Sequence, residues 1–251
     1  MNTVNLARRA AFFAPLLLAL AAVPVLLPAS ALAATTGSGK AASQTRNVGE
    51  FQAIKSAGAM DIVVRQGATT SVQVTADDNL LPLLETVVEG SGDSATLIVR
   101  WKRGENIHHD SDVKVSVVTP RLSMLSAAGS GDIVVEAFQT PALQVAVAGS
   151  GNAKLDRLST DDLGIRISGS GDVGGQGRAA KMKVNIAGSG SVNLTDMKAD
   201  DVSVSIAGSG DAAVNAHRTL DVSIAGSGDV VYTGDATVKS SVAGSGSVKR
   251  K

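Results

Sequence analysis

The tripeptide Gly-Ser-Gly recurs through the second half of the chain at nearly regular spacing, and this repeat constrains the fold more than any other feature. Successive copies lie 18 to 20 residues apart and begin at Gly129, Gly149, Gly169, Gly188, Gly208, Gly226 and Gly244. A fixed period in this range is typical of a solenoid, in which each repeat is one structural unit that packs against its neighbours. We therefore expect the repeats to stack as successive coils.

Apolar residues alternate with other residues on both sides of each Gly-Ser-Gly. The positions two and four residues before the first glycine are apolar in most copies, as in Ile206 and Val204, and the position six residues before it is often apolar too, as in Val202. The positions four and six residues after it are mostly apolar too, as in Val192 and Leu194. A period of two predicts two half-buried strands per repeat and excludes a helix, whose apolar spacing would be three or four residues.

These patterns predict an all-β fold, a right-handed β-helix built as a two-sheet solenoid with about 20 residues per coil and a Gly-Ser-Gly corner in each coil. A left-handed solenoid of hexapeptides would need an apolar residue every six positions, whereas the apolar residues here form close pairs. Hydrophobic residues make up 44% of the chain and aromatic residues only 2%. The core must therefore consist of Val, Ile, Leu and Ala, which suits the interior of a narrow coil.

The N-terminus has the pattern of an export signal. Arg8 and Arg9 precede an apolar run over residues 10–28, and Ala31-Leu32-Ala33 is a small-x-small cleavage site. We predict a signal peptide over residues 1–33 rather than a membrane anchor, because the run is about 18 residues long and contains three prolines. Residues 34–47 are small and polar and are predicted to be a flexible leader.

A single domain is expected over residues 48–251, with a cap and first coils over 48–125 and the repeats over 126–248. Residues 57–64 (AGAMDIVV) align with residues 128–135 (AGSGDIVV) and are predicted to form a degenerate first coil. Residues 77–85 predict a short helix with Asp78 or Asn79 as its N-cap and Pro82 in the first turn. Strands are expected over 94–101 and 112–119. A solenoid needs such an atypical unit to cover its open end.

The N-terminal part of this domain carries further motifs. Val48-x-x-Phe51-x-x-Ile54 is followed by Met60-Asp61-Ile62-Val63-Val64-Arg65-Gln66-Gly67, by Val74-x-Ala76-Asp77-x-Asn79-Leu80-Leu81 and by the AGSGD repeats. This combination, over about residues 46–248, resembles the bacterial family described as putative auto-transporter adhesin, head GIN domain. The resemblance implies an exported β-helix, similar to pectin-lyase-like folds but without catalytic residues, and a role in cell adhesion.

The residue that follows each Gly-Ser-Gly is polar, and in a β-helix these residues would form a column: Asp132, Asn152, Asp172, Ser191, Asp211, Asp229 and Ser247. The column could be a cation ladder, or its side chains could accept hydrogen bonds from turn N–H groups. We favour the second interpretation because Asn and Ser dilute the charge, and because calcium-binding solenoids repeat every nine residues. The aspartates Asp132, Asp172, Asp211 and Asp229 are therefore not assigned as metal ligands.

His108-His109-Asp110 lies in a polar stretch, residues 102–111, that is expected to be a loop between two strands. Neighbouring histidines point in different directions in an extended chain, so shared metal ligation is not expected. A catalytic site in the cap would have to combine Arg65, Arg100 or Arg121 with Asp61 or Asp112.

Motifs of hydrolases, nucleotide-binding loops and zinc proteases are absent from the sequence. The outward positions of the strands that precede the corners are small and mostly uncharged: Gln144, Ala146, Arg166, Lys183, Asn185, Ser203, Ser205 and Ser223. Because these positions contain no cluster of acids, we predict no enzyme, no cofactor, and no catalytic, cofactor-binding or metal-binding residue.

The amino-acid composition limits the classes of ligand that this protein is expected to bind. Lys and Arg total 23, equal to Asp and Glu, without a basic patch, so a nucleic-acid ligand is not expected. The absence of Cys excludes disulfides and thiol chemistry.

We expect an exported, non-enzymatic protein of the bacterial cell envelope, periplasmic, secreted or at the cell surface. It would present an adhesion or interaction surface to a glycan or protein, with no membrane anchor after signal cleavage. The alternatives are a polysaccharide-active, pectin-lyase-like enzyme and a purely structural envelope component.

The C-terminal end of the solenoid is a further candidate interface. Val238, Val242 and Val248 would lie next to solvent in a last coil, which favours a weak homodimer through this end. The tail Lys249-Arg250-Lys251 would oppose such a dimer at low salt.

Overall fold

The computed structural model describes residues 34–109 and 111–251, so the signal peptide predicted over residues 1–33 lies outside the described residues. Two short 3-10 helices, η1 (Leu81–Leu83) and η2 (Gly92–Ser94), are the helical segments of the described part. The strands are β1 (Thr35–Thr36), β2 (Ala41–Arg46), β3 (Ala53–Ala57), β4 (Asp61–Gln66), β5 (Ser71–Asp77), β6 (Leu84–Glu89), β7 (Thr96–Trp101), β8 (Ile107–His108), β9 (Lys114–Thr119), β10 (Met124–Gly129), β11 (Ile133–Glu136), β12 (Gln139–Gly149), β13 (Ala153–Gly169), β14 (Val173–Gly188), β15 (Ser191–Gly208), β16 (Asp211–Gly226), β17 (Asp229–Thr233), β18 (Thr237–Gly244) and β19 (Ser247–Arg250).

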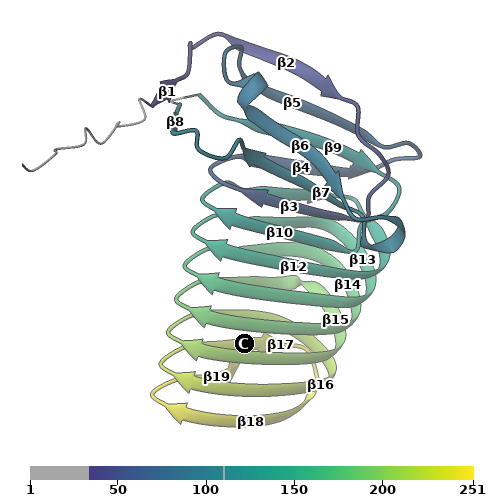
Figure 1. Ribbon diagram of the computed structural model, residues 1–251. Helices are drawn as coiled ribbons and strands as arrows, with labels where there is room; N and C mark the ends of the chain where they lie inside the picture. Colours follow the sequence, from purple (N-terminus) through teal and green to yellow (C-terminus); the bar gives the residue numbers. More distant parts are fainter. Residues whose placement is uncertain (1–33, 110) are drawn as a thin grey trace, which may run out of the picture. The chain divides into compact units, whose positions relative to one another are not determined.

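The strands stack as parallel coils that wind in a right-handed sense, as the sequence predicts (Figure 1). We call face A the sheet whose strands lead into the Gly-Ser-Gly corners, and face B the sheet whose strands leave them. The long strands β13 to β16 run along face B, bend across a short third side and continue along face A to the next corner. Each coil is therefore hydrogen-bonded to the coils before and after it along most of its length.

The interior is filled by ladders of aliphatic side chains. Val184, Val204 and Val222 occupy paired positions in three successive coils, and each is almost fully buried. Ile206 and Ile224 are likewise paired and buried, whereas the intervening Ser205 is exposed, so the predicted inward and outward phase is confirmed. Burial of these stacked aliphatic groups is the main source of stability, because each inward side chain is removed from water by its neighbours above and below.

Backbone contact between coils explains the glycines of the corner. Gly188 has a φ of +134°, and a Cβ added there would lie 2.2 Å from the carbonyl oxygen of Gly169 in the preceding coil. The third residue of the same corner, Gly190, would place a Cβ 2.2 Å from the carbonyl oxygen of Gly171. Only glycine allows both the left-handed backbone conformation and this close approach, so the tripeptide recurs with the coil.

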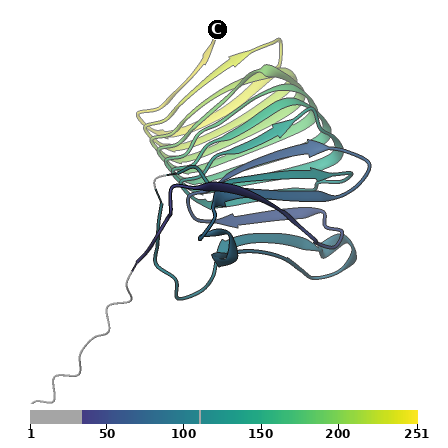
Figure 2. The same cartoon turned by 90° about the horizontal axis from the view of Figure 1, so that it is seen from above.

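The coil over residues 57–64 was expected to be the first, and the structure corrects this. Its strands β3 and β4 pair with β10 and β11 on one side, in the register that the alignment predicts (Ala57 with Ala128, Ile62 with Ile133). On the other side they pair with β7 and β9, which come later in the chain. After β4 the chain enters the cap and forms β7 and β9 next to β3 and β4. It then continues to β10 and β11 on the opposite side of β3 and β4, where the regular repeats begin (Figure 2).

The cap covers the N-terminal end of the coils with antiparallel strands. The coil strands β9 and β7 pair antiparallel with the cap strands β5 and β6, respectively. Each of the two coil strands therefore has a hydrogen-bonding partner on its outer side. The predicted strands over 94–101 and 112–119 correspond to β7 and β9. Covering these edges satisfies backbone groups that an open coil would expose.

The flexible leader predicted over residues 34–47 is wrong for most of its length. Ala41–Arg46 form β2, which pairs antiparallel with β5, and the Ser43 and Thr75 hydroxyls are 2.7 Å apart. The Arg46 guanidinium donates a 2.6 Å hydrogen bond to the Leu81 carbonyl oxygen. The small polar residues form a strand because the outer edge of β5 offers backbone partners, which composition alone does not reveal.

The predicted helix over residues 77–85 is reduced to the 3-10 helix η1. Its N-cap is Leu80 and no side chain caps it, so neither Asp78 nor Asn79 is the N-cap. Both side chains instead contact the leader: Ser38 donates from its Oγ to Asp78 Oδ1 (2.5 Å) and from its backbone N–H to Asn79 Oδ1 (2.9 Å). Tertiary hydrogen bonds have therefore replaced the local cap.

Candidate functional site

The polar column after the Gly-Ser-Gly corners is a hydrogen-bonded ladder. The Oδ1 atom of one residue accepts from the backbone N–H of the equivalent residue in the next coil, at 2.8 Å from Asn152 to Asp132, 3.1 Å from Asp172 to Asn152 and 2.8 Å from Ser191 to Asp172. The same bond joins Asp229 to Asp211 and Ser247 to Asp229, both at 2.8 Å. The N–H donor belongs to the next coil and not to the residue's own turn, which differs from the Asx-turn interpretation.

The ladder also extends into the cap, where Asp61 Oδ1 accepts from the Asp132 N–H at 3.0 Å. Its side chains project from a solvent-exposed corner, and hydrogen bonds from Ser247 lower the pKa of the Asp229 carboxyl. Within residues 34–109 and 111–251, no group of three or more His, Asp or Glu side chains is arranged to hold a metal ion. Among the described residues no such bond joins Asp211 to Ser191, so the ladder runs in two stretches, Asp61 to Ser191 and Asp211 to Ser247, with Asp and Asn side chains as the acceptors.

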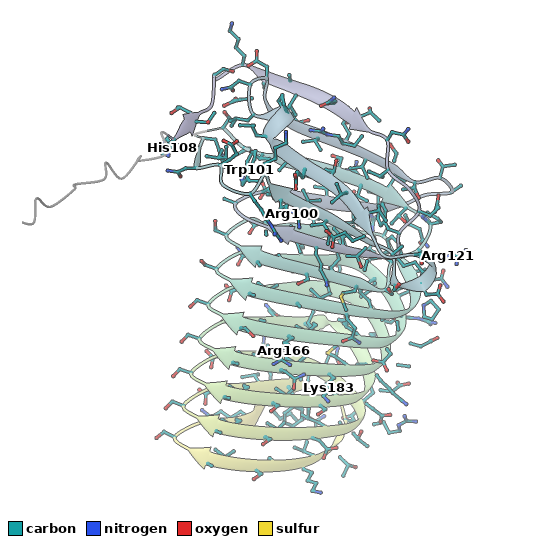
Figure 3. The ribbon with its side chains drawn as sticks, viewed as in Figure 1. Arg100, Trp101, His108, Arg121, Arg166 and Lys183 are labelled. Atoms are coloured by element: carbon teal, nitrogen blue, oxygen red, sulfur yellow. The ribbon has the colours of Figure 1, made fainter. Side chains whose placement is uncertain are left out.

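The histidine segment lies in the cap, and Asp110 is outside the described residues. Ile107 and His108 form β8, which pairs in parallel with β1, so the predicted loop contains a short strand. His109 Nδ1 lies 2.9 Å from the Ser111 carbonyl oxygen, and its ring centroid is 5.8 Å from that of Trp101. Figure 3 shows Trp101 and His108 in this part of the cap. These contacts hold the segment against the cap.

The arginines considered for a catalytic site have separate partners. Arg100 forms ion pairs with Glu85 (3.0 Å) and Glu89 (3.6 Å), across β6 and β7. Arg121 is exposed, well apart from Arg100 in Figure 3, and Asp112 is exposed as well. The structure therefore does not bring these groups together with Asp61, whose carboxylate belongs to the ladder.

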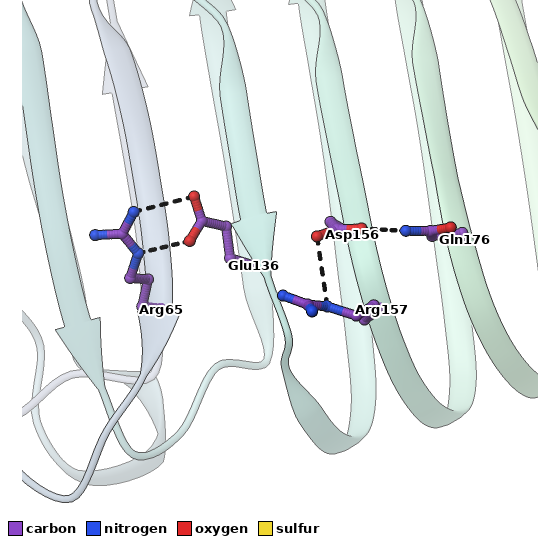
Figure 4. Close-up of polar contacts among 5 residues, drawn as sticks. All are labelled: Arg65, Glu136, Asp156, Arg157 and Gln176. Atoms are coloured by element: carbon purple, nitrogen blue, oxygen red, sulfur yellow. Dashed lines mark hydrogen bonds and ion pairs between the residues drawn. The ribbon is translucent and has the colours of Figure 1, made fainter.

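A row of polar contacts crosses neighbouring coils of face B (Figure 4). Arg65 donates two hydrogen bonds to Glu136, from Nε at 2.6 Å and from Nη2 at 3.1 Å, and this guanidinium lowers the pKa of the Glu136 carboxyl. In the next coils, Asp156 forms an ion pair with Arg157 (3.5 Å) and accepts a hydrogen bond from Gln176. Since these groups satisfy one another, the row links coils rather than forming a reactive site.

Face A is broad and polar on its outside. The outward positions predicted from the sequence are all exposed or partly exposed, and Figure 3 shows Arg166 and Lys183 among them. Towards the C-terminal coils they are mainly hydroxyls, and a shallow hollow of about 430 Å³ is lined by Lys183, Asn185, Ser203, Val204, Ser205, Asp221, Val222, Ser223, Lys239, Ser240 and Ser241. The spacing of parallel strands holds these side chains about 4.8 Å apart from coil to coil.

Face B carries a larger open groove that sequence reasoning missed. Its volume is about 590 Å³, and its polar lining residues come from neighbouring coils: Asp132, Asn152, Lys154, Asp172, Gln176, Asn193 and Asp196. The groove lies over Gly174 and Gly175, where β14 lacks side chains. The sequence contained one indication of this groove, the pair Gly174-Gly175, because the equivalent positions of β13 are the larger residues Lys154 and Leu155.

The described residues contain no helix that is both long and hydrophobic enough to cross a membrane. Among curated proteins, none matches this chain. Solved structures do match. A putative adhesin from Bacteroides fragilis is 25% identical with a TM-score of 0.80, covering 86% of this chain and 100% of its own. A putative lipid binding protein from Parabacteroides distasonis is 26% identical with a TM-score of 0.72, covering 87% and 100%.

A putative adhesin from Parabacteroides merdae shares the fold, with 22% identity, a TM-score of 0.70 and coverage of 86% and 98%. The family model described as putative auto-transporter adhesin, head GIN domain, matches residues 50–236, which is well over half of the chain. That span includes the cap, the ladder residues between Asp61 and Asp229, and the groove of face B. The chain thus belongs to the putative auto-transporter adhesin, head GIN domain family.

Proposed function

We propose that this protein is an exported, non-enzymatic component of the bacterial cell envelope whose outer faces form an adhesion or interaction surface. The observation that carries the proposal is the outside of the coils, where short polar side chains are repeated at a fixed spacing over two broad faces. A rigid, regularly spaced array of donors and acceptors can bind an extended ligand with little loss of conformational entropy in the protein.

Membership of the family and the names of the neighbours support an adhesion role over an enzymatic one. The N-terminal sequence pattern supports export. The name of the Parabacteroides distasonis neighbour points to lipid as another ligand. An acyl chain would need an enclosed apolar cavity, whereas the coil interior here is filled by aliphatic ladders and both large hollows are open to solvent and lined in part by charged side chains.

The proposal is tested with residues 34–251 coupled to beads and presented to arrays of defined glycans and purified envelope proteins. We expect the folded protein to retain at least one class of ligand, and the same beads to lose it after thermal unfolding. Failure to bind any arrayed ligand, or equal binding by unfolded protein, would contradict an adhesion surface.

The enzyme alternative has one observation in its favour, because the groove on face B contains Asp132, Asp172 and Asp196 with Lys154. Two of these carboxylates already accept ladder hydrogen bonds through Oδ1. Incubation with neutral, amino and acidic polysaccharides, followed by measurement of new reducing or unsaturated ends, separates the two functions. We expect no turnover, and chain cleavage that is lost in Asp196→Ala would establish the enzyme instead.

A further inference from the structure

Gly174 differs from the other glycines of the repeats. Its φ is outside the left-handed region, and a Cβ added there would have as its nearest neighbour the Asn193 carbonyl oxygen at 3.8 Å. Every other glycine between residues 126 and 248 would bring a Cβ to within 2.7 Å of another atom. Neither the backbone conformation nor packing therefore demands glycine at this position, although its missing side chain opens the floor of the groove.

The position of Gly174 explains the shape of the groove. It is an outward residue of face B, paired with Lys154 in the preceding coil and with Asn193 in the following coil. These two side chains stand on either side of the gap, and both line the groove. A side chain at residue 174 would close the gap between them.

The polar groups that line the groove have unused hydrogen-bonding capacity. Lys154 and Asp196 are exposed, and neither side chain makes a hydrogen bond or ion pair with another of the described residues. Asp132 and Asp172 are oriented by ladder bonds to Oδ1, which leave Oδ2 open. The Asn193 Oδ1 accepts from Thr195, and its amide NH₂ adds a donor, so the groove presents both donors and acceptors around a floor that includes Val134, Ala153 and Gly174.

The charge of the lining selects among ligands. Three aspartates, Asp132, Asp172 and Asp196, face one lysine, Lys154, so the groove is negative. Anionic ligands are therefore disfavoured, whereas hydroxyl groups can both donate to carboxylates and accept from Lys154 and the amides.

We propose that this groove binds a short, hydroxyl-rich saccharide that is neutral or carries amino groups. The proposal rests on the proposed function and assigns its ligand class to one place on face B. The volume of about 590 Å³ is in the range of small-molecule sites and suits a few sugar rings rather than a folded domain. The carboxylates that are fixed by the ladder supply acceptors whose orientation is set before the ligand arrives.

The test compares Gly174→Val with Ala213→Val. Ala213 occupies the same outward position of face B, two coils on from Gly174, and does not line the groove. Both changes add a β-branched side chain to a strand, which the fold should tolerate. Titration calorimetry with cellotriose, glucosamine trimer and galacturonate trimer, and with a lysine trimer as a control for charge, measures binding in each variant, and thermal melts check folding.

We expect the wild type and Ala213→Val to bind cellotriose or glucosamine trimer but not galacturonate trimer, and Gly174→Val to bind none. Lys154→Ala and Asp196→Ala should each weaken binding about tenfold, because each loses hydrogen bonds to a charged group. No binding of any trimer by the wild type would overturn the proposal, as would unchanged binding by Gly174→Val. Equal affinity for a lysine trimer would also overturn it, because charge alone would then explain the binding.

The bead assay separates this proposal from the proposed function. If Gly174→Val beads keep their full adhesion while the trimers fail to bind the groove, the adhesion surface lies elsewhere and only the saccharide assignment fails. If the wild type binds neither arrayed ligands nor trimers, both fail.

Discussion

The backbone N–H of Asn152 donates a 2.8 Å hydrogen bond to Oδ1 of Asp132, which occupies the same position one coil earlier. Asn152 makes the equivalent bond to the next coil, because its own Oδ1 accepts from the Asp172 N–H at 3.1 Å. Asp and Asn are equivalent in this role, since each offers an Oδ1 acceptor at the same distance from the backbone. The ladder therefore requires a side-chain acceptor and not a negative charge.

A ladder of this kind predicts independence from calcium. Thermal melts of residues 34–251 with millimolar Ca²⁺ and with chelator should coincide, and Asp132→Asn should melt like the wild type. Asp132→Ala should lower the midpoint, because the Asn152 N–H loses its acceptor. A midpoint several degrees higher with Ca²⁺ would show that the aspartates bind the ion.

The inward ladder predicts a large difference between neighbouring residues. Ile206 is 1% exposed and Ser205 is exposed, although they are adjacent in β15. Ile206→Asp should destabilise the fold by several kcal/mol, because it buries an unpaired charge among aliphatic groups. Ser205→Asp should change the stability by no more than about 0.5 kcal/mol. Urea unfolding measures both, and similar tolerance of the two would contradict the assigned burial.

The two kinds of glycine can be separated by the same substitution. Gly188→Ala should be strongly destabilising, because the Cβ would lie 2.2 Å from the Gly169 carbonyl oxygen and φ is +134°. Gly174→Ala has open space and should be neutral or stabilise the strand by about 0.5–1 kcal/mol. The denaturant midpoints of the two variants measure this difference in stability. A loss of stability in Gly174→Ala would mean that this glycine serves the fold.

The ion pair between Asp201 and Arg218 predicts a pH dependence in acid. The Arg218 guanidinium, whose Nε donates to Asp201 Oδ1 at 2.8 Å, lowers the pKa of the Asp201 carboxyl to about 2, and Thr219 contributes a further hydrogen bond. Because the folded pKa lies below the unfolded value of about 3.9, the pair stabilises the fold above about pH 4 and loses this effect as the pH falls towards 2. The effect should be modest and weakened by salt, since Arg218 is exposed and Asp201 is partly exposed.

Arg218→Gln provides the measurement for this pair. The difference in stability between this variant and the wild type should be present at pH 5 and should shrink as the pH approaches 2. A difference that stays constant over this range would rule out titration of Asp201 as its cause.

The C-terminal coil predicts weak self-association. β18 pairs with β16 and β19 with β17 on one side, and Val242 on β18 is 41% exposed. Two such edges can meet about a two-fold axis, while Lys239, Lys249 and Lys251 repel their counterparts. Sedimentation of residues 34–251 should therefore show a dimer that strengthens as salt rises. A monomer at all salt concentrations, with or without residues 249–251, would exclude it.

The fold of the repeats was determined by the sequence alone. Alternation with period two assigned the inward ladder of Ile206 and Ile224, and the Gly-Ser-Gly spacing assigned the corners. Both signals are local, because each coil repeats the same environment. One coil of sequence therefore carries the information needed for its neighbours.

Tertiary structure alone decided the rest. Three features depend on which unpaired strand edge lies nearby in the fold. They are the position of β3 between β7 and β10, the pairing of β2 with β5, and the hydrogen bonds from Ser38 to Asp78 and Asn79. The groove over Gly174 likewise draws its lining from strands that are about 20 residues apart in sequence and adjacent only in the stack. A composition or a motif cannot encode such neighbours, because parallel pairing between coils joins residues that no local pattern brings together.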